Sequence, residues 1–275
     1  MKALCSGLLL LMLVTVTPAH AWPGYALSFD GTTNGWVDMG AAVIPTSGDF
    51  TVACWAYCSV SNALTCREIL SQGSSGNAFY IGTEPGNNTF RLGDTWVSTD
   101  IPYPFHGWHH FALVKSANTI FYIDGASRAT NATPIANPSA STGLRLARQY
   151  GDYGEYWPGL IDEVQIWSRA LSPSEIQTSM TQEPDVGDSD LVAYWPFREA
   201  PGILRTADAS GHGHTGVLIN RPMRVLRGWP PLLLLNGTSP LTNECHAGFT
   251  DPGGNPGVFG RRLGVSRGVV VGDDH

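Results

Sequence analysis

Short segments of extended character recur roughly every ten residues along residues 25–167, separated by clusters of Gly, Asn, Asp, Ser and Pro. In the last of these segments, residues 159–167, Leu160, Val164 and Ile166 stand at even spacing and therefore share one face of a strand. No helical pattern longer than about two turns interrupts the series. Alternating strand and helix units are therefore excluded. The spacing predicts an all-β fold, a two-sheet antiparallel sandwich with apolar side chains between the sheets.

A turn and a short helix are expected after this last strand. Ser172 is suited to cap the helix, Pro173 to occupy its first position, and Glu175 to reach back to the cap. This capping box predicts that a helix begins at Pro173.

The composition limits the partners of the chain. Only 14% of its 275 residues are charged, the formal net charge is -7, and Lys and Arg form no stripe. A nucleic-acid partner is not expected, because proteins that bind nucleic acid carry a basic face. The 32 Gly and 19 Pro indicate many loops, and the length suffices for one large all-β domain or two ordinary ones.

Residues 1–21 have the pattern of a secretory signal peptide. Lys2 supplies a positive charge, residues 8–16 an apolar core, and Ala19 and Ala21 a small-x-small cleavage site. We expect cleavage after Ala21 and secretion to the extracellular space, with an uncleaved anchor as the alternative. No later apolar run reaches the roughly 18 residues of a membrane span, so membrane insertion of the mature chain is not expected.

A secreted chain is expected to pair its cysteines. Removal of the signal peptide leaves Cys54, Cys58, Cys66 and Cys245. Cys58 and Cys66 flank a short polar loop between two strand-like segments, so a disulfide bond across this hairpin is predicted, contributing roughly 2–3 kcal/mol by loop closure. Cys54 is expected as a buried apolar side chain, with Cys54–Cys66 and Cys54–Cys245 bonds as alternatives.

Glycosylation sequons agree with secretion. Asn87 and Asn236 each begin one, and a third at Asn131 is weakened by the following Pro134. The pattern is short and common, so it does not establish secretion.

Four segments resemble LamG-like jellyroll domains, the laminin G-like branch of the concanavalin A-like lectin/glucanase superfamily. In the order of that family, they correspond to its opening hairpin, first long core strand, central hairpin and closing strand, at residues 26–40, 50–58, 107–125 and 159–176. The resemblance covers roughly residues 25–180. It implies an antiparallel two-sheet jellyroll sandwich over residues 22–181.

Residues 182–222 are interpreted as a linker followed by strands. Residues 190–202 and 206–218 resemble the leading strands that precede a LamG-like core. They either begin a truncated second repeat or return to complete the first sandwich. The second alternative is favoured, because a lone pair of strands is only marginally stable. Residues 223–275 are expected to form a poorly ordered tail.

Patterns typical of enzymes are absent from the sequence. Glycosidases of this fold that cut β-glucans carry a Glu-x-Asp-x-(x)-Glu strand motif, whereas Asp162 and Glu163 are adjacent and so point to opposite faces of a strand. No Gly-x-Ser-x-Gly elbow, phosphate-binding loop or zinc spacing occurs. His109 and His110 are interpreted as ordinary strand residues. We therefore expect a non-catalytic protein.

The resemblance implies a structural Ca2+ where the opening hairpin meets the closing strand. The matching positions are Asp30 and Asp162, whose carboxylates are ligands that Ca2+ prefers, with Asp38 as a weaker candidate. The alternative is that Asp30 caps its turn while Asp162 pairs with an arginine. A metal site at Asp208 and the two histidines that follow it is the least favoured interpretation.

Residues 148–157 combine many aromatic and polar side chains in one expected loop. Aromatic faces stack on sugar C–H surfaces while polar groups bind hydroxyls, although the rings can also fold back to close the ends of the sandwich. The predicted ligand-binding residues are Trp96, Arg148, Tyr150, Asp152 and Tyr153. We therefore predict a secreted, non-catalytic module for an extracellular ligand, with carbohydrate favoured. The alternative is a protein-interaction or adhesion module of the matrix or cell surface without sugar affinity.

Overall fold

The computed structural model describes residues 24–31, 35–60, 66–84, 86, 88–97, 99–105, 107–151 and 153–226. The predicted signal peptide and most of the predicted tail lie outside these residues, as do Asn87, Asp152, Asn236 and Cys245.

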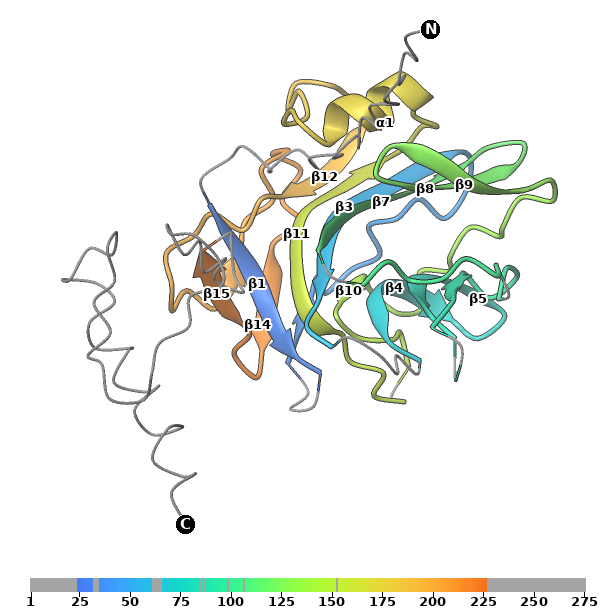
Figure 1. Ribbon diagram of the computed structural model, residues 1–275. Helices are drawn as coiled ribbons and strands as arrows, with labels where there is room; N and C mark the ends of the chain where they lie inside the picture. Colours follow the sequence, from blue (N-terminus) through green and yellow to red (C-terminus); the bar gives the residue numbers. More distant parts are fainter. Residues whose placement is uncertain are drawn as a thin grey trace, which may run out of the picture. The chain divides into compact units, whose positions relative to one another are not determined.

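The described strands form two antiparallel sheets that stack as layers (Figure 1). The larger sheet has the order β15-β1-β11-β3-β7-β8-β9, and β12 also pairs with β11. Its strands are β1 (Tyr25–Asp30), β3 (Phe50–Cys58), β7 (Trp108–Lys115), β8 (Thr119–Ile123), β9 (Ala126–Asn131), β11 (Pro158–Trp167), β12 (Leu191–Trp195) and β15 (Met223–Leu226).

The smaller sheet has the order β13-β14-β2-β10-β4-β5-β6. Its strands are β2 (Trp36–Asp38), β4 (Glu68–Ser74), β5 (Asn77–Thr83), β6 (Phe90–Leu92), β10 (Arg145–Leu146), β13 (Arg205–Thr206) and β14 (Gly216–Ile219). The predicted two-sheet antiparallel sandwich is confirmed.

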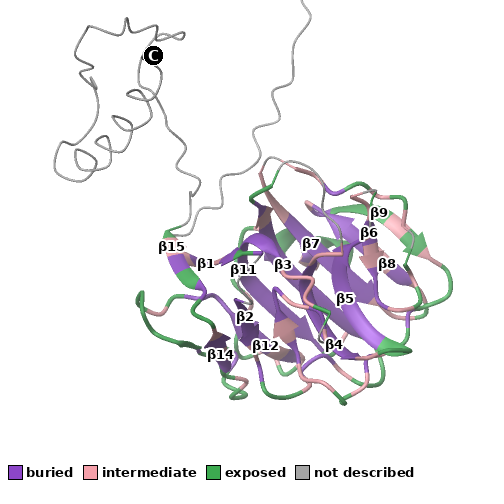
Figure 2. Cartoon of the chain, turned by 90° about the horizontal axis from the view of Figure 1, so that it is seen from below, coloured by how far each residue is buried: buried purple, intermediate pink, exposed green. Residues whose placement is uncertain are grey.

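The core lies between the sheets, where alternate side chains of both layers meet. Phe90 of the smaller sheet packs with its ring centroid 5.2 Å from that of Phe111 and 4.9 Å from that of Phe121, both in the larger sheet. Figure 2 shows that buried residues fill the central strands of both layers, whereas exposed residues gather in the connections. Such aromatic contacts add to the stability gained from burying apolar surface.

Strand β11 lies at the centre of the larger sheet, and all ten of its residues are buried. One edge pairs with β3; the other pairs first with β1 and then with β12. The register shifts between Asp162 and Gln165, and Glu163 adopts a φ of 49°. The acidic pair seen in the sequence therefore marks a β-bulge.

The segment after residue 190 extends both sheets of the same sandwich within the described residues. β12 pairs with β11, β14 pairs with β2, and β15 pairs with β1. The pairing of β12 with β11 is the arrangement expected if the strands after residue 190 return to complete the first sandwich. Residues 223–226 were expected to begin the poorly ordered tail, but they form β15. The predicted start of the tail at residue 223 was therefore too early.

Helix α1 (Pro173–Ser179) has the predicted capping box. The Glu175 backbone N–H donates to Ser172 Oγ at 3.3 Å, and the Ser172 N–H donates to Glu175 Oε2 at 2.7 Å. Ile176 and Leu171 pack against Trp167 and neighbouring apolar side chains on the outer face of the larger sheet. Within the described residues, no helix has the length and the apolar character that a membrane crossing requires.

Replacement of Gly159 by alanine is expected to destabilise the sandwich, because a Cβ there would lie 1.9 Å from the carbonyl oxygen of Tyr57. We expect the free energy of unfolding to fall by about 3 kcal/mol in urea denaturation. Gly107→Ala is the control, since its Cβ would meet only an ordinary contact, 3.6 Å from His109 Nε2. Equal stability of the two variants would contradict the close packing of β11 on β3.

Candidate functional site

Residues 147–157, here called the aromatic loop, connect β10 to β11. Ala147 and Trp157 at its ends are buried in the core, whereas Tyr150 in its middle stacks on Tyr80, which points to the outer face of the smaller sheet. The loop closes on itself, because the Trp157 N–H donates to the Ala147 carbonyl at 3.1 Å. It is bound to β4 at both ends: Ser71 Oγ donates to the Arg148 carbonyl at 2.7 Å, and the Glu68 N–H donates to the Glu155 carbonyl at 3.1 Å. The sheet therefore holds the loop backbone in place.

Arg145 orders the middle of the aromatic loop. Its Nη1 donates to the carbonyl oxygens of Gln149, Tyr150 and Gly151 at 3.3, 2.8 and 3.3 Å. A guanidinium presents several donors in a rigid plane, so one side chain satisfies carbonyls that would otherwise need water. The conformation of residues 149–151 is thus set before any ligand binds.

Two of the predicted ligand-binding residues use their side chains inside the molecule. The Arg148 guanidinium lies 4.8 Å from the centroid of the Trp36 ring and 5.7 Å from that of Tyr156. The Tyr150 ring stacks on Tyr80 with centroids 6.5 Å apart. These contacts match the alternative in which the rings fold back onto the sandwich, and they leave both side chains half-buried.

Tyr153 differs from the other rings of the aromatic loop, because 72% of it is exposed. Its ring lies over Gly151, where a Cβ would come within 2.6 Å of it. The absence of a side chain at Gly151 lets the ring lie close to the backbone. Asp152, which precedes Tyr153, lies outside the described residues.

Trp96, the remaining predicted ligand-binding residue, follows β6 and belongs to another segment. Its carbonyl accepts a hydrogen bond from the Leu92 N–H at 2.8 Å, and its half-buried ring packs against the core. The structure thus brings Arg148, Tyr150 and Tyr153 together in one loop, whereas Trp96 serves the packing beside β6.

A buried ionic cluster fixes the end of the aromatic loop. Arg91 Nη2 contacts the carboxylate of Glu68 and lies 2.5 Å from Glu155 Oε2. Glu68 is fully buried, and burial raises its pKa to about 8 even though Arg91 lies beside it and lowers it. Among the described residues Glu68 Oε2 has no hydrogen-bond partner, so this oxygen lacks the donors that would favour ionisation.

The carboxyl groups of Glu68 and Glu155 meet at one nitrogen of Arg91, yet Glu68 has no exposed surface through which a substrate could reach it. The cluster therefore anchors the aromatic loop to β4 and β6. Sequence reasoning missed it. The available signal was a single charged residue in each of two short strand segments, Glu68 beside Ile69 and Leu70, and Arg91 between Phe90 and Leu92.

The structure does not bring the predicted calcium ligands together. In the register between β1 and β11, Asp30 lies opposite Pro158, four residues from Asp162. At about 3.3 Å per residue this separates them by roughly 13 Å, too far for one ion with ligand distances near 2.5 Å. Asp162 is buried and accepts a hydrogen bond from the Glu163 N–H, whereas Asp30 is exposed. The residues present do not fit the calcium site that the resemblance implied.

The weaker metal candidates have other partners. Asp208 accepts hydrogen bonds from the backbone N–H groups of Tyr194 and His214, so it orders a turn. Asp38 accepts a hydrogen bond from the Gly40 N–H. No group of three or more potential metal-ligating side chains occurs within the described ranges.

The predicted disulfide bond between Cys58 and Cys66 is wrong for this structure: the three cysteines that the structure describes are all free. Cys58 faces the core together with Cys54, while the Cys66 thiol makes a hydrogen bond with Glu155. Burial raises the pKa of the Cys54 thiol to about 12 and that of Cys58 to about 11. Both thiols therefore stay protonated and unreactive at neutral pH.

A family profile matches residues 30–177, which is more than half of the chain. The chain belongs to the concanavalin A-like lectin/glucanases superfamily. This membership confirms the resemblance found in the sequence and agrees with the two stacked sheets. No curated protein sequence matched this superfamily member.

Solved structures similar to this superfamily member include a proposed carbohydrate-binding protein from Bacteroides ovatus. It is 17% identical, with a TM-score of 0.54, over 74% of this chain and 60% of that chain. Domain 4 of AbnA, an extracellular arabinanase from Geobacillus stearothermophilus, is 21% identical, with a TM-score of 0.45, over 58% and 82%. A pentraxin from Limulus polyphemus is 15% identical, with a TM-score of 0.42, over 72% and 96%. At these identities the likeness concerns the fold.

The raised pKa of Glu68 predicts how stability depends on pH. Because the folded-state pKa of about 8 exceeds the ordinary value of 4.5, the stability contributed by protonated Glu68 is complete below about pH 4.5 and is lost as the pH rises through about 8. Glu68→Gln should remove this loss, since its amide stays neutral. Urea denaturation across this pH range measures the effect.

The exposed carboxylate of Asp49 provides the control. Asp49→Asn should keep the pH dependence of the original protein. An unchanged pH dependence in Glu68→Gln would show that Glu68 is ionised throughout.

Proposed function

We propose that the chain is a secreted, non-catalytic member of the superfamily that binds carbohydrate through the aromatic loop. The observation that carries the proposal is the 72% exposure of Tyr153 on a loop whose backbone is held by Arg145 and by the Glu68–Arg91–Glu155 cluster. An exposed aromatic ring on a fixed backbone offers a flat apolar face at low entropic cost.

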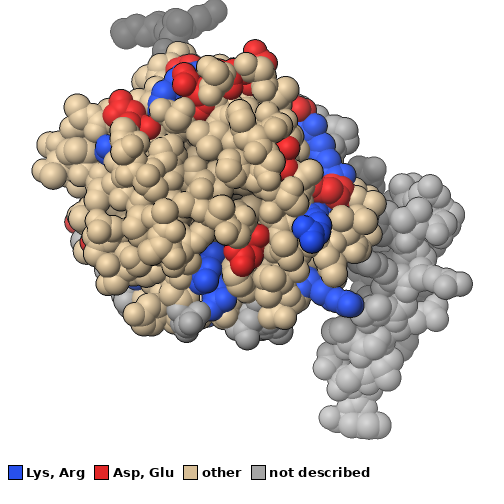
Figure 3. All heavy atoms as spheres, turned by 180° about the vertical axis from the view of Figure 1, so that it is seen from behind, with Lys and Arg blue, Asp and Glu red and all other residues tan. Residues whose placement is uncertain are grey.

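The surroundings of Tyr153 supply the polar groups that a sugar needs. Tyr150, which interacts with Tyr153, and Arg148 of the same loop are half-buried, so parts of both remain within reach of solvent. Figure 3 shows one face of the molecule, most of which is covered by uncharged side chains.

The choice of carbohydrate over a protein partner has two supports. Among the described residues Tyr153 is the single exposed aromatic ring, whereas protein interfaces usually centre on clusters of large apolar residues. The fold is shared with the Bacteroides ovatus protein that is proposed to bind carbohydrate. Secretion is supported by the signal-peptide pattern in residues 1–21.

Tyr153→Ala should weaken carbohydrate binding at the aromatic loop, because it removes the exposed stacking face. We expect affinity for any glycan retained on an array to fall at least about tenfold, measured by titration calorimetry. Tyr153→Phe should keep most of the affinity, since the ring remains. Met223→Ala is the matched control, as Met223 is 67% exposed on the distant strand β15.

Two outcomes would contradict the proposal. A blank glycan array would favour the protein-interaction alternative. Binding that survives Tyr153→Ala unchanged would remove the aromatic loop from the site, even if the protein binds sugar.

A further inference from the structure

A pocket lies on the outer face of the larger sheet, between the end of β11, helix α1 and residues 182–188. Its volume is about 280 Å³. Gln165 and Trp167 form part of its lining, together with Arg169, Glu175, Asp185 and Asp188. Because the middle of the aromatic loop lies on the outer face of the smaller sheet, the two sites are on opposite sides of the sandwich.

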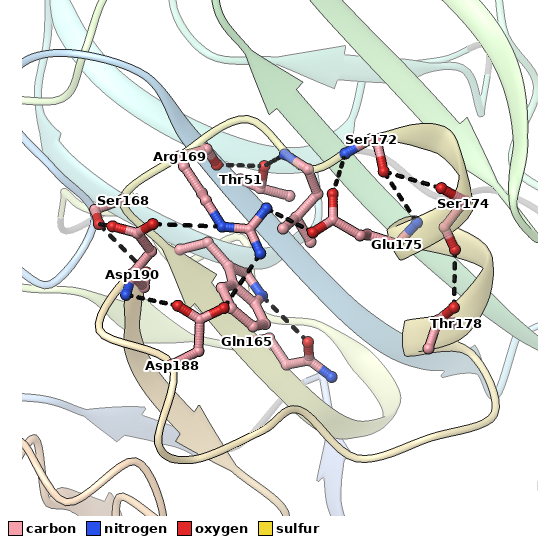
Figure 4. A network of polar contacts seen from close by, with 12 residues as sticks. Thr51, Gln165, Ser168, Arg169, Ser172, Ser174, Glu175, Thr178, Asp188 and Asp190 are labelled. Carbon is pink, nitrogen blue, oxygen red and sulfur yellow. Dashed lines mark hydrogen bonds and ion pairs between the residues drawn. The ribbon is translucent and has the colours of Figure 1, made fainter.

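The orientation of the Gln165 amide is fixed by its neighbour. Trp167 Nε1 donates a hydrogen bond to Gln165 Oε1 at 3.2 Å. An indole N–H is only a donor, so the amide oxygen must face Trp167 and the NH2 group must point away from it. Gln165 is only 1% exposed, and within the described residues its side chain makes one hydrogen bond, the bond from Trp167 that Figure 4 draws. The pocket therefore contains two directed donors that have no acceptor among the described residues.

The side of the pocket carries fixed acceptors. Arg169 Nη1 lies 2.7 Å from Glu175 Oε1, and its Nη2 lies 3.3 Å from Asp188 Oδ2 (Figure 4). A hydrogen bond with Ser172 lowers the pKa of Glu175, and the backbone N–H of Asp190 lowers that of Asp188. Both carboxylates thus stay ionised, and each has lone pairs left over for donors on a ligand.

A ligand that fits must accept hydrogen bonds from Gln165 and donate them to the carboxylates. A hydroxyl group does both, whereas an ammonium or guanidinium group has no acceptor for Gln165. Leu171 and Pro184 add apolar surface to the lining, which suits the C–H face of a sugar ring. A carboxylate on the ligand would be repelled by Glu175 and Asp188.

We propose that this pocket is a second carbohydrate site, which binds one neutral sugar ring and rejects acidic sugars. This pocket proposal deepens the proposed function and depends on it only for the class of ligand. None of the residues that line the pocket belongs to the aromatic loop. Two sites on opposite faces would let one chain link two glycan strands or bind a multivalent surface with higher avidity.

The test follows the side-chain NH2 signals of Gln165 by 15N NMR during titration with glucose, galactose, mannose and, as the matched acidic probe, glucuronic acid. At least one neutral sugar should shift these signals saturably, and glucuronic acid should not. Shifts with the amino acid lysine but with no neutral sugar would overturn the proposal, as would no shift with any probe.

Variants separate this site from the aromatic loop. Gln165→Glu keeps an oxygen for Trp167 but replaces the two donors, so it should weaken the neutral sugar at least about tenfold at this pocket. Gln177→Glu makes the same change on α1 outside the lining and should have no effect. If Gln165→Glu fails to fold, Thr178→Trp fills the pocket from the surface, with Thr181→Trp as its control.

The two proposals fail in different ways. If Tyr153→Ala removes all sugar binding and the Gln165 signals never move, the pocket proposal is overturned while the aromatic loop stands. If Tyr153→Ala has no effect but Thr178→Trp abolishes binding, the pocket stands and the loop proposal fails.

Discussion

The structure depends on the burial and pairing of β11 along both of its edges. Its ten buried residues have no access to water, so neighbouring strands must satisfy their backbone groups. β3 does so on one edge, and β1 and β12 share the other. Because β12 starts at Leu191, the sheet is complete only when the chain returns after helix α1. Residues 191–195 are therefore an integral part of the sandwich.

Each outer face of the sandwich carries a connecting segment, and in each case an arginine between carboxylates holds that segment in place. Arg91 with Glu68 and Glu155 fixes the aromatic loop on the smaller sheet. Arg169 with Glu175 and Asp188 fixes the turn and helix on the larger sheet. Such clusters leave neighbouring polar and aromatic groups in fixed positions, which lowers the entropy lost on binding.

The sequence predicted those features that depend on neighbours along the chain. Alternation at Leu160, Val164 and Ile166 marked β11, and Ser172, Pro173 and Glu175 marked the start of α1, because both signals are local. The fold followed from the order of such segments.

Features that depend on pairing between distant segments were missed or wrong. Asp30 and Asp162 do not meet, because the register of β1 on β11 places Pro158 opposite Asp30. Glu68 and Arg91 lie 23 residues apart and meet only through β5, which pairs with both of their strands. The exposure of a single ring such as Tyr153 also depends on how the loop folds. The composition of residues 148–157 therefore indicated a candidate loop, but not which of its rings is exposed. In the proposed function, the aromatic loop holds Tyr153 ready for a sugar. A crystal structure with a retained glycan tests this most directly: a sugar ring stacked on Tyr153 is predicted, and a sugar bound with Tyr153 uncovered would contradict it.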